Sequence, residues 1–344
     1  TIEYLTEKGA KIILMSHYKP EGKDEALSLK PISLHLEGLL GRKVNFLNDC
    51  LGEEVKNEIG KMKRGEVYFL ENLRLHQGEE KNDENFAKEL ASLGDIYIND
   101  AFSVSHRNHA SLVGIPRYLL SGAGFLLEKE IKTLSKIIQN LKRPLVVVIG
   151  GAKISTRIKV IEKFLKISDH LILGGKIANV ILAGKGLLIR GMTIEKELAE
   201  RIEKIALTNP KLHLPLDGII VCKKGEDYII REGAIGTVRK EEEVFDIGPE
   251  TRIIFKRIIK NAKMIFWSGP LGVFEDERFE NGTREIGEAI IGNRSAFKII
   301  GGGESLEAAK KFGFLDKFEH ISIGGGAMLQ FLAGEKLPGI EALK

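Results

Sequence analysis

Glycines follow four short apolar runs after residue 145, and these turns are the first places where phosphate chemistry is expected. The runs are VVVIGGAK (146–153), LILGGKIAN (171–179), KIIGGGES (298–305) and HISIGGGAM (320–328). Each is typical of a strand that turns tightly into a helix, whose N-terminal amides attract phosphate, and glycine lets that backbone come close. Four such turns along one edge of a parallel sheet predict a phosphate-binding surface. A single Gly-Gly pair is also compatible with an ordinary tight turn.

Two cations follow the first glycine pair. Lys153 comes directly after IGGA and Arg157 lies four residues later, which places both on one helix face. Fixed cations stabilise the charge that spreads over oxygens during phosphoryl transfer. A Lys and an Arg on an exposed helix face are the alternative interpretation. No G-x-x-x-x-G-K-[ST] occurs and no clean G-x-G-x-x-G follows a strand, which argues against a P-loop protein and a dinucleotide dehydrogenase.

Two acids also lie near glycine turns. Glu304 opens a predicted helix beside the expected phosphates, where one carboxylate with substrate oxygens would suit Mg²⁺. Capping of the helix by Glu304 or Ser305 is the alternative. Glu275 ends WSGPLGVFE (267–275) and is compatible with either a ribose hydrogen bond or an ordinary acid at a helix start.

Polar side chains follow the predicted strands of the first third, and they suit a small anion. The set is His17, Asn72, Arg74, Asn99, Asp100, His106, Arg107 and His109. Arginine binds carboxylate or phosphate through two parallel hydrogen bonds, so Arg74 and Arg107 are the principal candidates. Ion pairing to Glu71, Glu79 or Asp100 is the alternative. The histidines form no i, i+4 pair with a third ligand, so a metal is not expected there.

Short apolar runs alternate with helical patterns, which predicts an α/β fold with mostly parallel sheets. The expected strands of the first third are 11–17, 43–47, 66–72 and 95–102, and those of the second part include 218–222, 263–269 and the glycine-terminated runs. Between the two sets, Leu127, Ile131, Leu134 and Ile138 form one apolar helix stripe. A connecting helix over 126–144, ended by Pro144, is therefore predicted between two domains.

The composition is ordinary for a soluble globular protein: 43% of residues are hydrophobic, 29% are charged, and the net charge is +4. This mild charge does not indicate nucleic acid, and no apolar run approaches the roughly 20 residues that span a bilayer. The two cysteines, Cys50 and Cys222, lie far apart and fit no metal-ligand spacing. A reduced, cytoplasmic protein is expected.

Long motifs along the whole chain resemble one family, phosphoglycerate kinase. They include ENLRLHQGEEKND, INDAFSVSHRNHASLVG, VIGGAKISTRI, WSGPLGVFE, IIGGGES and HISIGGGAMLQFLAGEKLPGIEAL, in the family's order. The resemblance implies two Rossmann-like domains: 1–125 plus 328–344, which binds 3-phosphoglycerate, and 145–327, which binds nucleotide. It implies reversible phosphoryl transfer from 1,3-bisphosphoglycerate to MgADP, giving 3-phosphoglycerate and MgATP in glycolysis and gluconeogenesis, by a monomer.

The same resemblance implies roles for particular residues. His17, Arg74 and Arg107 match positions around the glycerate phosphate, and Lys153 and Arg157 match two lysines along the nucleotide phosphates. Glu275 matches the ribose-binding acid, and Gly174 and Gly175 match the turn near adenine. The loop for the magnesium-bound phosphates is matched by Gly302, Gly303, Glu304 and Ser305.

Several positions depart from the family pattern. Lys19 stands where the substrate site has arginine, Arg157 replaces a lysine, and Glu304 replaces an aspartate. Ser268 replaces an asparagine, and Val244 stands where glycine is common. The family's first strand, with R-x-D-x-N, and the following arginine would precede Thr1, so the chain as written is expected to be weak or inactive. A non-catalytic nucleotide-binding or scaffold descendant of the kinase is the alternative function.

Overall fold

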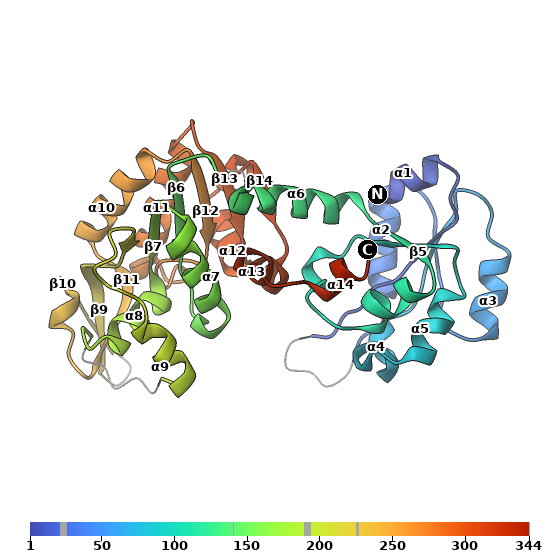
Figure 1. Ribbon diagram of the computed structural model, residues 1–344, viewed down its shortest axis with the longest axis horizontal. Helices are drawn as coiled ribbons and strands as arrows, with labels where there is room; N and C mark the ends of the chain where they lie inside the picture. The colour runs from blue at the N-terminus through green and yellow to red at the C-terminus, as the bar shows by residue number, and fades with distance from the viewer. Residues whose placement is uncertain (21–25, 140, 189–193, 225–226, 344) are drawn as a thin grey trace. The chain divides into compact units, whose positions relative to one another are not determined.

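The computed structural model describes residues 1–20, 26–139, 141–188, 194–224 and 227–343 (Figure 1). The chain divides into two compact units, Thr1–Lys129 with Lys336–Lys344, and Glu130–Glu335. The sequence analysis assigned residues 328–344 to the first domain. In the structure, helix α13 (Gly325–Ala333) lies in the second unit, and the chain joins the first unit only from Lys336. Within the described ranges, no helix has both the length and the apolar character to cross a membrane.

The first unit contains two parallel sheets, one with the strand order β1-β3-β2 and one formed by β4 and β5. The strands are β1 (Ile12–Leu14), β2 (Val44–Phe46), β3 (Val67–Phe69), β4 (Ile96–Asn99) and β5 (Leu120–Ala123). The four predicted strands are present, each shorter than its predicted range. The fifth, β5, was missed because its sequence LSGA has no apolar run.

Short helices and single turns connect these strands. They are α1 (Ile2–Glu7), α2 (Lys30–Leu40), α3 (Glu53–Gly60), α4 (Gln77–Lys81), α5 (Glu84–Ala91), α14 (Pro338–Glu341), the 3₁₀ turns η1 (Leu73–Leu75), η2 (Phe102–Val104) and η4 (Ile115–Arg117), and the π turn η3 (Ala110–Gly114). The C-terminal segment is held by two bonds: Asn99 Nδ2 donates to the Gly339 oxygen (3.1 Å), and Gly339 N donates to the Ser105 oxygen (2.8 Å).

The predicted connecting helix is α6 (Phe125–Gln139), which ends before the predicted limit at Pro144. It begins where Asp100 Oδ1 accepts from the amides of Leu126 (2.8 Å) and Leu127 (3.0 Å). These bonds satisfy orphan donors of the first helical turn. Leu127 and Leu134 are fully buried as predicted, and Ile137 is fully buried where the pattern had favoured Ile138.

The second unit is built on a six-stranded parallel sheet with the order β14-β13-β12-β6-β7-β8. Its strands are β6 (Leu145–Ile149), β7 (His170–Leu173), β8 (Leu212–His213), β12 (Met264–Ser268), β13 (Phe297–Gly301) and β14 (His320–Ser322). Every residue of β6 and β12 is buried, as expected when helices cover both faces of a parallel sheet. The helices are α7 (Ile154–Ile167), α8 (Gly175–Gly184), α9 (Lys196–Glu203), α10 (Pro249–Lys260), α11 (Asn281–Gly292), α12 (Gly303–Lys311) and α13.

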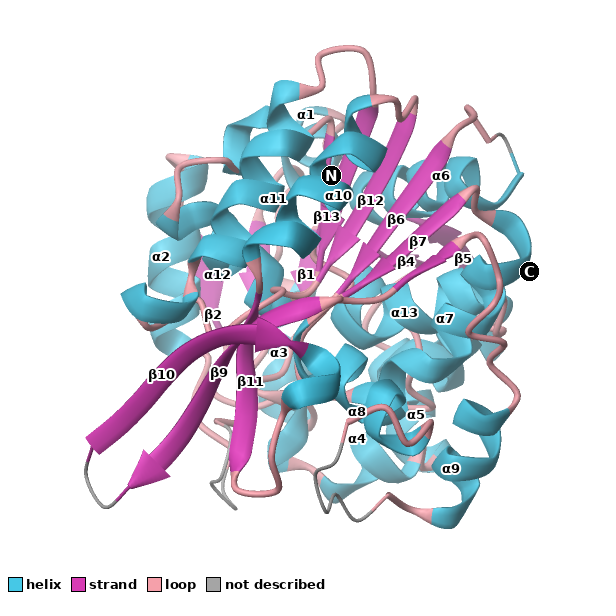
Figure 2. Cartoon of the chain, turned by 90° about the vertical axis from the view of Figure 1, so that its left-hand side faces the viewer, coloured by secondary structure: helices cyan, strands magenta, loops and turns pink. Residues whose placement is uncertain are grey.

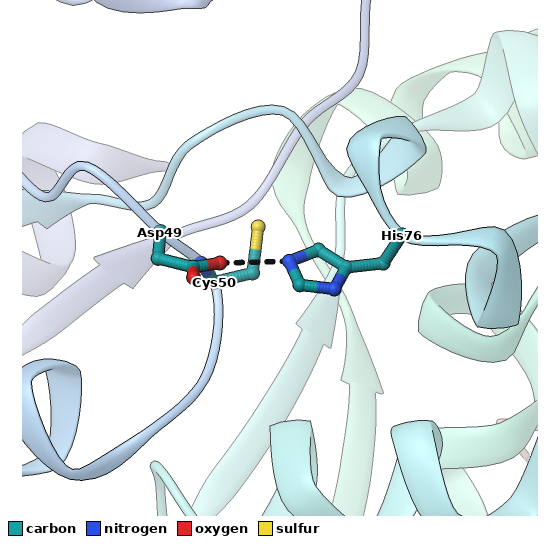
Figure 3. A group of neighbouring side chains, drawn as sticks. All are labelled: Asp49, Cys50 and His76. Carbon is teal, nitrogen blue, oxygen red and sulfur yellow. Dashed lines mark hydrogen bonds and ion pairs between the residues drawn. The ribbon is translucent and has the colours of Figure 1, made fainter.

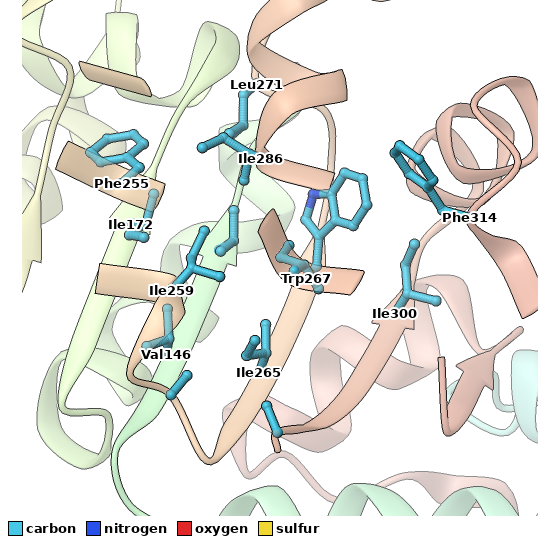
Figure 4. Close-up of a cluster of buried hydrophobic side chains, with 14 of the residues drawn as sticks. Val146, Ile172, Phe255, Ile259, Ile265, Trp267, Leu271, Ile286, Ile300 and Phe314 are labelled. Carbon is cyan, nitrogen blue, oxygen red and sulfur yellow. The ribbon is translucent and has the colours of Figure 1, made fainter. Parts of the chain in front are cut away.

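Alternate side chains of β12 define the two hydrophobic layers of this unit. Ile265 and Trp267 pack into a cluster with Phe255 of α10 and Ile286 of α11 (Figure 4). On the other face, the ring of Phe266 lies 5.7 Å from that of Phe164 in α7. The period of two along a strand thus fixes which helix each residue meets.

A separate antiparallel sheet, β10-β9-β11, corrects one sequence-based expectation (Figure 2). The run 218–222 was expected among the mostly parallel strands. It lies in β9 (Asp217–Lys224), which pairs antiparallel with β10 (Asp227–Ala234) and β11 (Glu242–Ile247). Only two residues separate β9 from β10 in the sequence, and that spacing permits a hairpin but not a parallel crossover.

Asp217 fastens this sheet to α10. Its Oδ1 accepts from Thr251 N (2.9 Å) and Thr251 Oγ1 (2.6 Å), and its Oδ2 accepts from Glu250 N (3.1 Å). Asp217 is buried, so these partners are shielded from water.

We therefore expect Asp217→Ala to lower the free energy of unfolding by about 2 kcal/mol, because charged hydrogen bonds are lost and amides are left unpaired. Urea denaturation followed by tryptophan fluorescence measures the change, since Trp267 lies in the same unit. Glu232→Ala, at an exposed position of β10, is the matched control and should change little. Equal stability of the two variants would contradict the assigned role.

Candidate active site

Three strand ends of the second unit meet through glycine. The turns after β6, β12 and β13 contain Gly151, Gly269 and Gly302, with φ of +85°, +94° and +99°. These values lie in the left-handed region that favours glycine. A Cβ on Gly150 would collide with the Pro270 carbonyl, and Gly151 N donates to the same oxygen at 2.7 Å. The turns after β6 and β12 therefore lock together through their backbones.

The helices that follow these turns differ in what their first amides can bind. No side chain caps the N-termini of α7 and α12, so both ends present backbone donors with the positive end of the helix dipole. In α8, by contrast, Gly175 N donates to the Leu271 oxygen (3.0 Å) and Ile177 N to the Gly151 oxygen (3.2 Å). Predicted anion binding thus suits α7 and α12, whereas Gly174 and Gly175 serve close packing.

A cavity of about 310 Å³ opens beside these turns. Glycine backbone from Gly151 and Gly175 lines one part, and apolar side chains such as Val244, Phe245 and Leu271 line another. Phe245 is braced edge-to-face by Phe279, with 4.9 Å between ring centroids. A flat apolar group next to a negatively charged one would match this division.

The predicted residues are spread around this cavity. Gly175, Glu275 and Glu304 line it, whereas the other predicted nucleotide residues lie outside its lining: Lys153, Arg157, Gly174, Gly302, Gly303 and Ser305. Lys153 is the exposed N-cap of α7. Ser305 is fully buried, donates to the Gly301 oxygen (3.0 Å) and accepts from Gly269 N, so its hydroxyl joins two of the turns.

Arg157 lies beneath the glycine turns. Its side chain is buried, its guanidinium donates to the Gly150 oxygen, and its Nη2 lies 3.6 Å from Glu304 Oε2. Burial lowers the pKa of Arg157, and the Glu304 carboxylate opposes that shift. The spacing of Lys153 and Arg157 predicted one helix face for both, but the longer side chain folds back onto the turns while Lys153 is exposed to solvent.

In the first unit, Asn72 brings two segments of the predicted anion site together. Its Nδ2 donates to the Tyr18 oxygen (2.6 Å), and its Oδ1 accepts from Tyr18 N (3.3 Å) and Arg74 N (3.0 Å). The loop of His17 and the η1 turn of Arg74 are therefore fixed to one buried side chain. Lys19 lies one residue beyond Tyr18 and is exposed.

Basic side chains converge at this end of the first unit. The rings of His17 and His109 lie 6.3 Å apart. Burial, together with the charges of Arg74 and Arg107, lowers the pKa of His17 to about 4. Burial and then Arg107 lower the pKa of both His106 and His109. A cluster that disfavours its own protonation is suited to an anion.

Buried donors support this interpretation. Within the described ranges, His106 Nδ1 and His109 Nδ1 are buried and have no hydrogen-bond partner. Arg74 Nε is also buried, but it forms an ion pair with Glu80 Oε1 (3.1 Å) and not with the acids that the sequence suggested. Buried polar atoms normally have partners, so the unsatisfied atoms indicate a ligand with acceptor oxygens.

Sequence reasoning missed several residues that line the second-unit cavity. Lys176 lines the cavity and directly follows Gly174-Gly175, whereas Lys153 follows its glycine pair after one alanine, and this recurrence of lysine after a glycine pair could have identified it. Asp246 had no such signal: its Oδ2 accepts from Gly282 N (2.6 Å), and burial raises its pKa to about 7. Asn179 acts locally, since its Nδ2 donates to the Val244 oxygen (3.0 Å).

Comparisons with known proteins point to one family. A family model described as phosphoglycerate kinase matches residues 1–335. Phosphoglycerate kinases of Dictyoglomus turgidum and Moorella thermoacetica are both 44% identical over 349 residues, which cover 100% of this chain and 88% of each relative.

Solved structures agree as well. The phosphoglycerate kinases of Coxiella burnetii and Pyrococcus horikoshii have TM-scores of 0.85 and 0.84 and identities of 37% and 33%, each over 99% of this chain and 88% of theirs. The predicted fold class, α/β with mostly parallel sheets, is confirmed. The chain belongs to the phosphoglycerate kinase family.

Proposed function

We propose that this chain transfers a phosphoryl group reversibly between 1,3-bisphosphoglycerate and MgADP, giving 3-phosphoglycerate and MgATP. The observation that carries the proposal is the basic cluster of His17, Arg74, Arg107 and His109, in which His109 Nδ1 is buried without a hydrogen-bond partner and the charges of Arg74 and Arg107 act on His17. A small, highly charged phosphoester offers the acceptor oxygens that such a cluster needs. In this proposal Lys19 adds a point charge at the exposed side of the site.

The nucleotide belongs in the cavity of the second unit. The apolar part around Val244 and Phe245 suits a base, and Glu275, which is exposed and lines the cavity, suits ribose hydroxyls. The phosphates would lie toward the N-termini of α7 and α12, with Lys153 at the first of these. Arg157 and Ser305 would act by holding the turns in place, with Arg157 also adding positive charge.

The residues present fit a magnesium ion that enters with the nucleotide. Glu304 lines the cavity at the start of α12, and 43% of its side chain is exposed, so one carboxylate is available beside the expected phosphates. Magnesium commonly takes one or two carboxylates together with substrate oxygens and water. When bound, it would neutralise charge on the phosphates.

We propose that the protein acts as a monomer, which sedimentation can check.

We expect Lys153→Ala to lower turnover by roughly 100-fold while raising the Michaelis constant for ATP much less, because a fixed cation acts mainly on the transition state. A steady-state assay of the full-length protein measures both quantities. Lys166→Ala, exposed in the last turn of α7, is the control. Unchanged turnover would remove Lys153 from the mechanism, and a parent protein that binds nucleotide without forming ATP would favour the non-catalytic alternative.

For the acceptor site, Arg74→Ala should weaken 3-phosphoglycerate binding by about 1.5 to 3 kcal/mol, which is the usual loss for a hydrogen bond to a charged group. Titration calorimetry of the folded variant gives this value directly. Arg117→Ala, at an exposed position of the same unit, should bind like the parent. If the Arg74 variant binds 3-phosphoglycerate as tightly as the parent, the only role left for Arg74 is its ion pair with Glu80.

Protonation of His17 provides an independent test. In the free protein its ring should titrate near pH 4, and 3-phosphoglycerate should raise this pKa because an anion stabilises imidazolium. Binding should therefore take up protons at pH values above 4, and affinity should increase as the pH falls toward that value. Histidine NMR resonances report the shift, with exposed His35 of α2 as the control signal. An ordinary histidine pKa for His17 in the free protein would contradict its buried position beside Arg74 and Arg107.

A further inference from the structure

One group of three metal-ligating side chains stands out among the described residues, and it lies outside the residues assigned to substrates above. Asp49, Cys50 and His76 each offer one ligand atom, and these atoms all lie within 4.8 Å of one another (Figure 3). The closest two are Asp49 Oδ1 and His76 Nε2, at 2.7 Å. Asp49 and Cys50 follow strand β2, whereas His76 ends the η1 turn after β3.

We propose that Asp49, Cys50 and His76 form a site for a borderline-soft divalent cation, with Zn²⁺ as the best match. Carboxylate oxygen, thiolate sulfur and imidazole nitrogen are its normal protein ligands. The proposal goes beyond the kinase activity and does not depend on it. A solvent water would complete the coordination, because Asp49 and His76 are partly exposed.

The spacing of the three atoms requires only a local adjustment. Ligands bound at about 2.0 to 2.3 Å in a tetrahedron lie roughly 3.3 to 3.7 Å apart, so the Asp49–His76 pair must open by less than an ångström or so. Both side chains can move, since 56% and 30% of their surfaces are exposed. Cys50 is fully buried and would be the fixed ligand.

The ligand set also discriminates against magnesium. Mg²⁺ is a hard cation that prefers oxygen ligands in an octahedron, and this group supplies one carboxylate only. Thiolate and imidazole favour zinc and other late first-row metals. The site should therefore remain selective for Zn²⁺ at the Mg²⁺ concentrations used in a kinase assay.

Binding must replace bonds that are present without the metal. The Cys50 thiol donates to the Glu71 oxygen (2.9 Å), and Asp49 Oδ1 also accepts from Cys50 N (2.6 Å). On coordination the S–H bond breaks, its proton passes to solvent, and the sulfur electron pair goes to the metal. Because binding releases this proton, it should strengthen as the pH rises.

Titration of the full-length protein with Co²⁺ tests the proposal, because a cobalt–thiolate bond gives a charge-transfer absorption band. We expect one equivalent to produce the band, Zn²⁺ to abolish it, and excess Mg²⁺ to leave it intact. Cys50→Ser should remove the band. Cys222→Ser, which changes the other, partly exposed cysteine, is the matched control and should retain it.

A second variant tests the site without changing the buried cysteine, in case Cys50→Ser does not fold. His76→Gln changes a partly exposed position and keeps the thiol, and it should weaken Zn²⁺ binding at least about tenfold, since even outer-shell changes cost 10- to 100-fold. Calorimetry with zinc chloride gives this ratio. Loss of the band only in Cys222→Ser, retention of it in Cys50→Ser, or parental zinc affinity in His76→Gln would each overturn the site.

Discussion

The second unit depends on one steric constraint, which is the close approach of backbone at three strand ends. A Cβ on Gly150 would strike the Pro270 carbonyl, one on Gly269 would strike the Gly150 carbonyl, and one on Gly175 would lie 3.0 Å from Gly151 N. Only glycine permits this contact. The same contact sets where α7 begins, and hence where its uncapped amides point. Close packing and anion binding thus need the same residues, so the two explanations of the glycines are complementary.

The first unit builds its anion site from side chains instead, and it must hold several basic groups together without a ligand. Two acidic side chains offset part of this positive charge. Glu80 pairs with Arg74 at 3.1 Å. Glu79 is fully buried, accepts from Ser111 N (3.0 Å) and Oγ (2.6 Å), and lies 3.7 Å from His109 Nδ1. Burial is the largest cause of the low pKa values of His17 and His109, and the charges of Arg74 and Arg107 lower both values as well.

Local patterns predicted the parts of this protein that local physics determines. Apolar runs located the strands of the parallel sheets other than β5 and β8, and glycine after a run located the turns, since both depend on neighbouring residues. Which strands pair with each other was harder to predict: β9 was recognised as a strand, but its antiparallel neighbours were not. Cys50 and His76 lie 26 residues apart in the sequence, so only the fold brings them together. Likewise, helical spacing placed Lys153 and Arg157 on one face but could not show that the guanidinium folds back onto Gly150.

Two departures from the family pattern meet in the structure and are best understood as one coupled change. The resemblance implies lysine at the position of Arg157 and aspartate at that of Glu304, and both residues here are longer. Their charged ends lie 3.6 Å apart while Arg157 also donates to the Gly150 oxygen. A planar guanidinium can hold a carbonyl and a carboxylate in fixed directions, whereas an ammonium is a point charge on a flexible stem. The added methylene of Glu304 keeps its carboxylate within reach of that guanidinium while part of it still faces the cavity. The pair therefore keeps one positive and one negative charge together beneath the glycine turns.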